Sequence, residues 1–246
     1  LKHLLDASDR GASDLTVAGK LFCDRFPLDK IPALPTCGIF LRREFPLKNN
    51  LEFPEGIHPC EDGLFSHFVL ALTEKISFCP EAVYHYRQHE QGNHHQIRKR
   101  TADILPMIPR WLSLIEEFYE QRHLWKRKAG HLVRFIEHEP FELRLLGMPF
   151  SPPEQEILYS IIRDFLNAHC TAAECRRASL HLPFRLLLQS SGFSDFGRRL
   201  RRAGKNTGIR RKLLHFCPVP SWRRNGRAQL RQVREQLEEI RRNITF

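Results

Sequence analysis

The fold is decided by residues 53–65, which read Phe-Pro-Glu-Gly-Ile-His-Pro-Cys-Glu-Asp-Gly-Leu-Phe. Two adjacent carboxylates, Glu61 and Asp62, follow a turn-forming segment and precede an apolar run. From Leu64 to Leu72 the apolar residues fall at i, i+1, i+4, i+5 and i+8, which predicts one face of an amphipathic helix. Free backbone N–H groups and the helix dipole favour an acid at such a start. The sequence therefore predicts a helix that carries two fixed carboxylates in its first turn.

Segments on either side extend this pattern. Upstream, residues 36–45 read Thr-Cys-Gly-Ile-Phe-Leu-Arg-Arg-Glu-Phe, and downstream Tyr84-His85-Tyr86-Arg87 closes a β-branched and aromatic run. The residue types predict strands over 75–79 and 82–87. Helical spacing of apolar residues predicts further helices, which cover residues 13–26, 40–50, 103–136 and 154–168.

Together these segments resemble the second half of a family 2 glycosyltransferase of the GT-A type. The likeness covers about residues 25 to 97 and follows the order of an arginine-bearing segment, an E-G-x(n)-E-D-x-x-F signature and an aromatic Y-x-Y-R strand. It implies an α/β fold, namely the Rossmann-like nucleotide-diphospho-sugar transferase half of GT-A, followed by a mainly α-helical C-terminal region. We expect three parts, which are the acceptor-side part of the catalytic domain at 1–98, a helical extension at 99–192 and a basic helical tail at 193–246.

The resemblance also implies roles for individual residues. Asp62 matches the catalytic base, and Glu61 would organise the site or reach the acceptor. Arg87 and His89 match positions that hold the donor pyrophosphate, where guanidinium and imidazole groups suit a diphosphate. The segment with Cys37 and Arg42 matches the acceptor side. The simpler alternatives are a plain helix cap for Glu61–Asp62, a surface ion pair for Arg87 and a solvent-facing side chain for Arg42.

The family's donor half carries an Asp-x-Asp motif that binds a divalent cation, Mg or Mn. No Asp-x-Asp occurs in this sequence, and the chain begins at Leu1 without a Met, about 35 residues before the acceptor segment. We therefore expect a truncated enzyme that is inactive without donor-binding sequence, and we predict no metal site within the chain. Cys170, Cys175 and His181 lack a fourth zinc ligand at a usual spacing.

The composition of the chain indicates the compartment and the kinds of partner that we expect for the protein. The seven cysteines form no C-x-x-C pair, which favours reduced thiols in a cytoplasmic protein. No stretch approaches the roughly 18 apolar residues of a membrane-spanning helix. The net charge of +11 lies wholly in residues 195–246, which hold 15 Lys+Arg and 4 Asp+Glu. Such a charge attracts a polyanion.

The functional prediction is an inverting transfer of a sugar from a nucleotide-sugar donor to a polysaccharide or lipid-linked acceptor in cell-envelope glycan synthesis. The tail at 195–246 would hold the enzyme at the inner face of the cytoplasmic membrane. The alternatives are a nucleic-acid-binding tail, or a helical interaction module that self-associates through the apolar repeat at 230–244. The absence of zinc-finger, RNP-like and helix-turn-helix patterns argues against nucleic acid.

Overall fold

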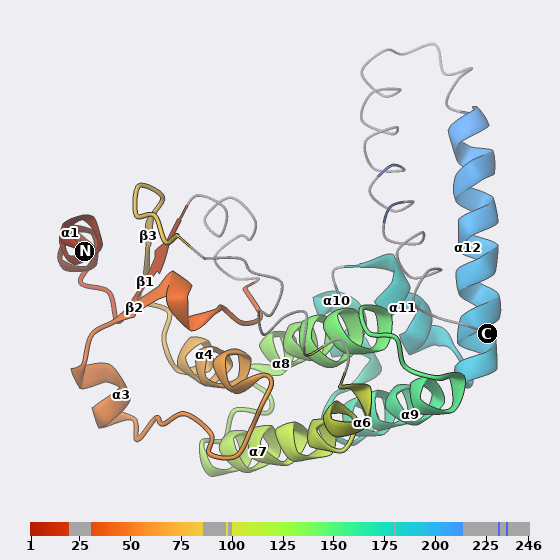
Figure 1. Ribbon diagram of the computed structural model, residues 1–246, viewed down its shortest axis with the longest axis horizontal. Coiled ribbons are helices and arrows are strands. Elements are labelled where there is room, and N and C mark those ends of the chain that lie inside the picture. Colours follow the sequence, from red (N-terminus) through yellow and green to blue (C-terminus); the bar gives the residue numbers. More distant parts are fainter. Residues whose placement is uncertain are drawn as a thin grey trace. The chain divides into compact units, whose positions relative to one another are not determined.

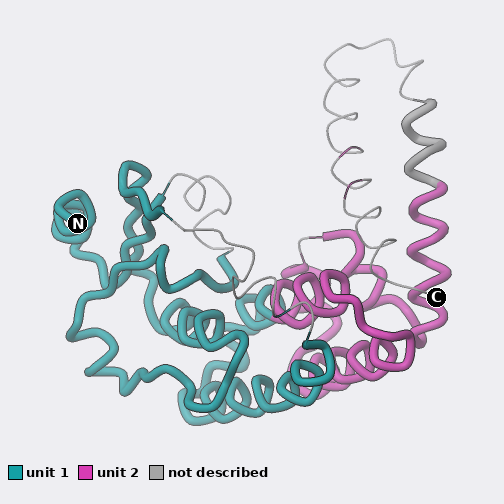
Figure 2. The backbone as a smooth tube through the Cα atoms, in the orientation of Figure 1, with its two compact units in different colours: residues 1–135 teal, residues 136–246 magenta. Residues whose placement is uncertain are grey.

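The computed structural model describes residues 1–19, 31–85, 97, 100–179, 181–213, 231 and 235. The chain divides into two compact units, residues 1–135 and residues 136–246 (Figure 2). Unit 1 combines helices with a small three-stranded sheet, and the described residues of unit 2 are helical (Figure 1). The prediction of an α/β region followed by a helical region is confirmed. The assignment to a GT-A, Rossmann-like fold stays a prediction, because a sheet of this size is compatible with other folds.

The sheet of unit 1 has the order β2-β1-β3. The central strand β1 (Leu15–Ala18) pairs antiparallel with β2 (Ile39–Leu41) and parallel with β3 (Ile76–Cys79). All four residues of β1 are buried, because strands flank it on both sides and α1 (Lys2–Arg10) packs against β1 and β3. The predicted strand at 75–79 is thereby confirmed.

Of two other predictions near the sheet, one is wrong and one is confirmed in part. The proposed helix at 13–26 is a strand in its described part, because Leu15, Thr16 and Val17 complete the ladders on both sides. The short helix predicted at 40–50 is confirmed in its later part as α3 (Glu44–Lys48), which ends at Asn49, whereas residues 40 and 41 belong to β2. In both segments, pairing with distant residues overrides the local helical spacing of the apolar side chains.

Residues 82–85, the described part of the strand predicted over 82–87, do not join the sheet. Pro80 and Glu81 turn the chain directly after β3, and the side chains that follow face solvent. Val83 is 71% exposed and Tyr84 is 59% exposed. The β-branched and aromatic composition of this segment was therefore a misleading indicator of a strand.

The helix predicted after Glu61–Asp62 is confirmed as α4 (Glu61–Leu72). Its residues from Gly63 to Ala71 are all buried, so the helix runs through the interior of unit 1 instead of lying on its surface. The helices predicted over 103–136 are also present, as α6 (Thr101–Ile104), α7 (Met107–Gln121) and α8 (Ala129–Ile136). Within unit 1, α4 packs on α7.

His67, at the middle of α4, is fully buried and joins three other segments. Its Nδ1 lies 3.2 Å from the carbonyl oxygen of Pro32, and its Nε2 lies 3.1 Å from the Tyr119 hydroxyl of α7. His131 of α8 stacks on the His67 ring at 4.2 Å between centroids and donates from Nε2 to the His67 carbonyl oxygen at 3.1 Å. Because a carbonyl only accepts, the His67 proton is on Nδ1, and Nε2 accepts from Tyr119. Burial favours the neutral form of both imidazoles, because it lowers the pKa of each.

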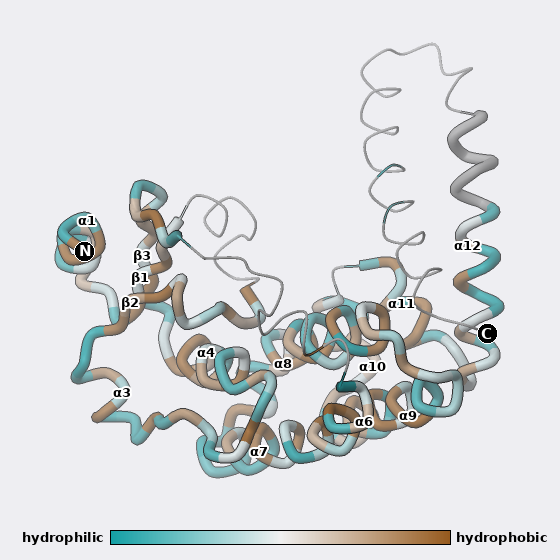
Figure 3. The backbone as a smooth tube through the Cα atoms, viewed as in Figure 1, coloured by the Kyte–Doolittle hydropathy of each residue, from teal (hydrophilic) through white to brown (hydrophobic). Residues whose placement is uncertain are grey.

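Unit 2 begins with an unusual helix, η3 (Glu137–Leu146), a π-helix with Pro140 inside it. Proline has no N–H to donate to an earlier carbonyl, and a wider π turn accommodates that loss. The following helices are α9 (Pro152–His169), α10 (Ala172–Ala178), α11 (Leu182–Gln189) and α12 (Phe193–Leu213). The predicted helix at 154–168 is thereby confirmed. Figure 3 shows hydrophobic and hydrophilic residues alternating along α9, as expected of a helix with one buried face.

The predicted part boundaries were residues 98 and 192, whereas the two compact units meet after Phe135. The last predicted part begins at residue 193, where α12 begins. However, Phe193, Phe196 and Leu200 of α12 are buried in the core of unit 2. The start of α12 is therefore part of the core of unit 2, and the predicted division of the chain into three parts stays a prediction.

The buried histidine pair predicts that unit 1 loses stability in acid. Burial lowers the pKa of His131 to about 4, and burial together with the neighbouring His131 lowers the pKa of His67 well below its usual range. The unfolded chain takes up these protons below about pH 6.5 whereas the folded chain does not, so the free energy of unfolding falls as pH drops from 6.5 to 4. The loss is about 3 kcal/mol for His131 alone, measured by urea denaturation across this pH range.

His131→Gln should make this pH dependence shallower. His3→Gln, which removes an exposed histidine of α1, should leave it unchanged. Equal pH slopes for the wild-type protein and His131→Gln would contradict the assignment.

Candidate functional site

The start of α4 is fixed by a sharp turn. The His58–Pro59 peptide bond is cis, and Cys60, the N-cap residue, has a left-handed backbone with φ of 90°. A side chain at positive φ is strained, and such residues gather at sites where the backbone must turn in a defined direction. The Cys60 carbonyl then accepts the Leu64 N–H at 2.9 Å and starts the helix. Glu61 and Asp62 occupy the first turn, so neither is the N-cap.

An extended segment, residues 31–36, lies along α4 and brings the acceptor segment to it. Its alternate residues contact successive side chains of the helix. The Pro32 carbonyl meets His67, and the Leu34 N–H donates to Ser66 Oγ at 2.8 Å. The Thr36 N–H approaches Asp62 Oδ2 at 3.4 Å. That last distance is longer than a typical N–H···O bond, so Asp62 is only weakly engaged by its neighbour.

Cys37 lies beside Asp62 as a result. Both are half-buried, and Cys37 belongs to the short 3-10 turn η2 (Thr36–Gly38) that precedes β2. Burial raises the pKa of the Cys37 thiol, and the negative charge of Asp62 raises it further. The thiol therefore stays protonated and can donate a hydrogen bond towards the carboxylate or a bound hydroxyl. The structure thus brings together Asp62, Glu61 and Cys37, three of the residues singled out in the sequence.

His58 and Phe53 also belong to this site, although the sequence did not single them out. His58 Nδ1 lies 3.3 Å from Glu61 Oε1, and both side chains reach solvent, being 44% and 36% exposed. The Phe53 ring stacks on Phe65 of α4 at 4.1 Å between centroids, yet Phe53 is 50% exposed. Phe65 follows Glu61 by one turn of α4, so the Phe53 ring offers an aromatic surface, of the kind on which a sugar ring can stack, at the same end of the helix as the two carboxylates. Both residues could have been proposed from the sequence, because they lie within the 53–65 stretch that contains Glu61 and Asp62.

The Arg42 side chain contacts the end of α1 and the loop after it, and not Asp62. Its Nε donates to the Ser13 carbonyl at 3.0 Å, and its Nη2 donates to the Ser8 carbonyl at 3.2 Å and to Asp9 Oδ1 at 2.6 Å. These contacts join β2 to the end of α1 and use the guanidinium for structure. The structure therefore does not bring Arg42 to Asp62, and a role in acceptor binding is not supported by its position.

Arg87 and His89, predicted to hold the donor pyrophosphate, lie outside the described residues. Within the described ranges, no group of three His, Cys, Asp or Glu side chains is placed to hold a metal ion. The divalent cation implied by the resemblance thus has no identified ligands among these residues. No helix in the described part of the chain is long and apolar enough to cross a bilayer.

Comparison with known proteins returns no match, whether with protein-family models, with curated proteins or with solved structures. The resemblance to family 2 glycosyltransferases therefore rests on the residues quoted above.

The position of Arg42 predicts a structural effect on substitution. Arg42→Lys removes the forked contacts to two carbonyl groups and should lower the free energy of unfolding by about 1–2 kcal/mol. The exposed ion pair with Asp9 adds little to this. Urea denaturation measures the loss, and Arg43→Lys, at the exposed neighbouring position, is the matched control. An equal and small effect of both substitutions would show that the Arg42 contacts contribute no stability.

Proposed function

We propose that this chain is the acceptor-side part of an inverting, family 2-like glycosyltransferase with Asp62 as its general base. One observation carries the proposal, namely that a weakly engaged carboxylate stands in the first turn of a buried helix, beside the Cys37 thiol and about one turn before Phe65, on which the half-exposed Phe53 ring stacks. A base must be held rigidly near the reacting hydroxyl, and the burial of α4 supplies that rigidity.

The connection from β1 to β3 supports the GT-A part of the proposal. These strands are parallel neighbours in the sheet, and the connection between them contains the antiparallel strand β2, then α3 and α4. Parallel neighbours need a crossover, which in α/β folds is usually a helix. Asp62 thus stands on a crossover helix of a sheet, as expected for a Rossmann-like transferase half.

In the proposed reaction the Asp62 carboxylate takes the proton from an acceptor hydroxyl. The oxygen attacks the anomeric carbon of the donor, and the bond from that carbon to the nucleoside diphosphate breaks, with the electron pair leaving on the diphosphate. Attack opposite the leaving group inverts the anomeric centre. Glu61, which His58 contacts, orients the acceptor by accepting a hydrogen bond from a second hydroxyl. Arg87 and His89 are proposed to neutralise the departing diphosphate.

Asp62→Asn tests the base. The amide keeps the shape and can still accept the Thr36 N–H, but it cannot take a proton. We expect the turnover number to fall by about 100- to 10,000-fold with the fold retained. The measurement is release of nucleoside diphosphate from a panel of nucleotide sugars, in the presence of a cell-envelope glycan extract. The protein is produced from the first initiator codon of its reading frame, so that any upstream donor-binding sequence is included.

Asp103→Asn is the matched control, because Asp103 is another first-turn acid but lies on α6. It should leave turnover unchanged. Retained turnover in Asp62→Asn, with circular dichroism unaltered, would rule out the base assignment. No nucleotide-sugar turnover by the wild-type protein would contradict the transferase proposal itself.

We also propose that α12 holds the protein at an anionic membrane surface. Phe193, Phe196 and Leu200 bury one face of the helix. Arg198, Arg201, Arg202 and Lys205 are exposed and recur at i, i+3, i+4 and i+7, which places them on another face. Asp195, the acid of the first turn, accepts hydrogen bonds from Arg198 and Arg199. These bonds, chiefly the one from Arg199, lower the pKa of Asp195 to about 2. The exposed face thus stays net positive.

The double substitution Arg202→Gln and Lys205→Gln should weaken binding to phosphatidylserine-containing vesicles by about 30-fold, because each basic residue contributes about 1 kcal/mol near such a surface. Cosedimentation at low salt measures the loss. Lys2→Gln with Lys48→Gln removes the same charge from exposed positions of unit 1 and should have little effect. Equal losses in both pairs would contradict a specific role for α12, and preferential binding to duplex DNA would favour the nucleic-acid alternative.

A further inference from the structure

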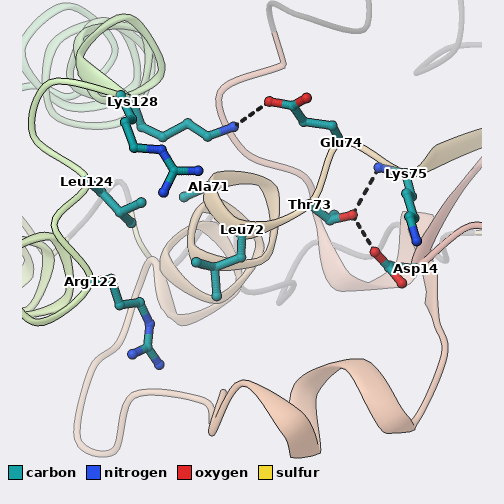
Figure 4. Close-up of a pocket in the computed structure, with 10 residues that line it drawn as sticks. Asp14, Ala71, Leu72, Thr73, Glu74, Lys75, Arg122, Leu124 and Lys128 are labelled. Atoms are coloured by element: carbon teal, nitrogen blue, oxygen red, sulfur yellow. Dashed lines mark hydrogen bonds and ion pairs between the residues drawn. The ribbon is translucent and has the colours of Figure 1, made fainter.

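A pocket of about 480 Å³ lies at the other end of α4 from Asp62 (Figure 4). It is bounded by the end of α4, by the loop from Thr73 to Lys75 that leads into β3, and by the connection between α7 and α8. Its volume falls within the range of small-molecule sites. All of its lining residues belong to unit 1.

Four basic side chains line the pocket, and two acidic ones accompany them. The basic residues are Lys75, Arg122, Arg127 and Lys128. Both acids are already engaged. Asp14 accepts the Thr73 hydroxyl at 2.6 Å, and Glu74 pairs with Lys128 at 3.2 Å. Figure 4 shows these two contacts.

The two side chains of the Glu74–Lys128 ion pair differ strongly in their exposure to solvent. The Glu74 side chain is 89% exposed whereas that of Lys128 is 18% exposed, so Glu74 extends into solvent while most of the Lys128 side chain is covered by protein. Among the described residues, the side chains of Lys75 and Arg127 form no ion pair. The pocket therefore holds more positive charge than its acids neutralise.

Arg122 is fixed in place before any ligand arrives. Its Nη2 donates to the Asn49 carbonyl at 2.6 Å, and its guanidinium lies 4.6 Å above the Phe118 ring centroid. Its Nε is buried and has no hydrogen-bond partner among the described residues. A buried N–H without an acceptor is costly, so the guanidinium would gain from any small rearrangement that lets a bound anion accept from it.

We propose that this pocket binds the phosphate group of a phosphorylated molecule. Guanidinium groups donate paired hydrogen bonds to phosphate oxygens, and the lysines add charge. Ala71, Leu72 and Leu124 supply an apolar wall for the organic part of the ligand. A free organic phosphate and a lipid headgroup share this chemistry.

The site is separate from the proposed transferase reaction. Leu72 lies ten residues after Asp62 on one helix, which is about 15 Å along its axis. The inference goes beyond the proposed function and stands or falls without it, since its test uses no nucleotide sugar.

The test is titration of the ¹⁵N-labelled protein with inorganic pyrophosphate, followed through the Arg122 Nε–Hε resonance, which Arg122→Lys identifies by its loss. We expect this resonance to shift on saturation. Arg127→Gln should weaken pyrophosphate binding by about fivefold, through loss of a charge-assisted hydrogen bond. Glu74→Gln should strengthen it by about two- to fivefold, because it removes a carboxylate that competes for Lys128.

Lys126→Gln is the matched control, because it removes the same charge from an exposed neighbour that does not line the pocket. An unchanged Arg122 resonance in saturating pyrophosphate would overturn the proposal. Equal effects of Arg127→Gln and Lys126→Gln would do the same, because they would indicate attraction to overall charge alone. Arg127 is exposed, so its substitution tests binding without endangering the fold.

A second arm identifies the source of the phosphate. Vesicles of phosphatidylcholine and phosphatidic acid are sedimented with protein carrying Arg202→Gln and Lys205→Gln, which removes the proposed contribution of α12. If adding Arg127→Gln weakens this binding further, the pyrophosphate result is assigned to a lipid headgroup. If it does not, the result is assigned to a soluble organic phosphate.

Discussion

The arrangement of unit 1 depends on the contact between the extended segment 31–36 and the buried helix α4. Alternate residues of an extended chain are about 6.6 Å apart, which is close to the spacing of side chains four apart on a helix. Leu34 and Thr36 therefore reach Ser66 and Asp62 in turn, while Pro32 reaches His67. His67 extends the same contact to α7 and α8. The segment that leads into β2 is thereby fixed to the helix that carries Glu61 and Asp62.

Features encoded in local periodicity were predictable from the sequence. The helix α4 follows from the apolar run after Asp62, and α9 from its long amphipathic pattern. The strand β1 was missed because Leu15 and Ala18 happen to fit a helical spacing, while the reason for the strand lies in pairing with residues 39–41 and 76–79. The prediction for residues 82–85 was wrong in the opposite way, because a strand was expected where the structure has none. Its composition suits a strand, but the turn at Pro80 and Glu81 directs it into solvent.

In the candidate site too, some features could be expected from the sequence, whereas others depend on contacts and backbone conformations that only the structure shows. Only the family resemblance assigned Cys37 an acceptor-side position, and the 31–36 segment supplies the physical reason why it lies beside Asp62. The contact between His58 and Glu61 depends on the left-handed backbone at Cys60, and this conformation could not be predicted from the residue types around it. Arg42 had two open orientations in the sequence. The carbonyl groups of Ser8, in α1, and of Ser13, in the loop after it, set its direction, and both lie about 30 residues earlier in the chain.

The two ends of α4 have opposite chemical character, with carboxylates at its start and a basic pocket at its finish. The helix between them is buried throughout, and its bonds to segment 31–36 hold it against sliding. A ligand at one end can therefore influence the other mainly through its charge. Over about 15 Å, which exceeds the Debye length of roughly 8 Å at physiological salt, that influence is largely screened where the groups face solvent. The rigid helix thus keeps the two proposed sites at a fixed separation and makes them energetically independent.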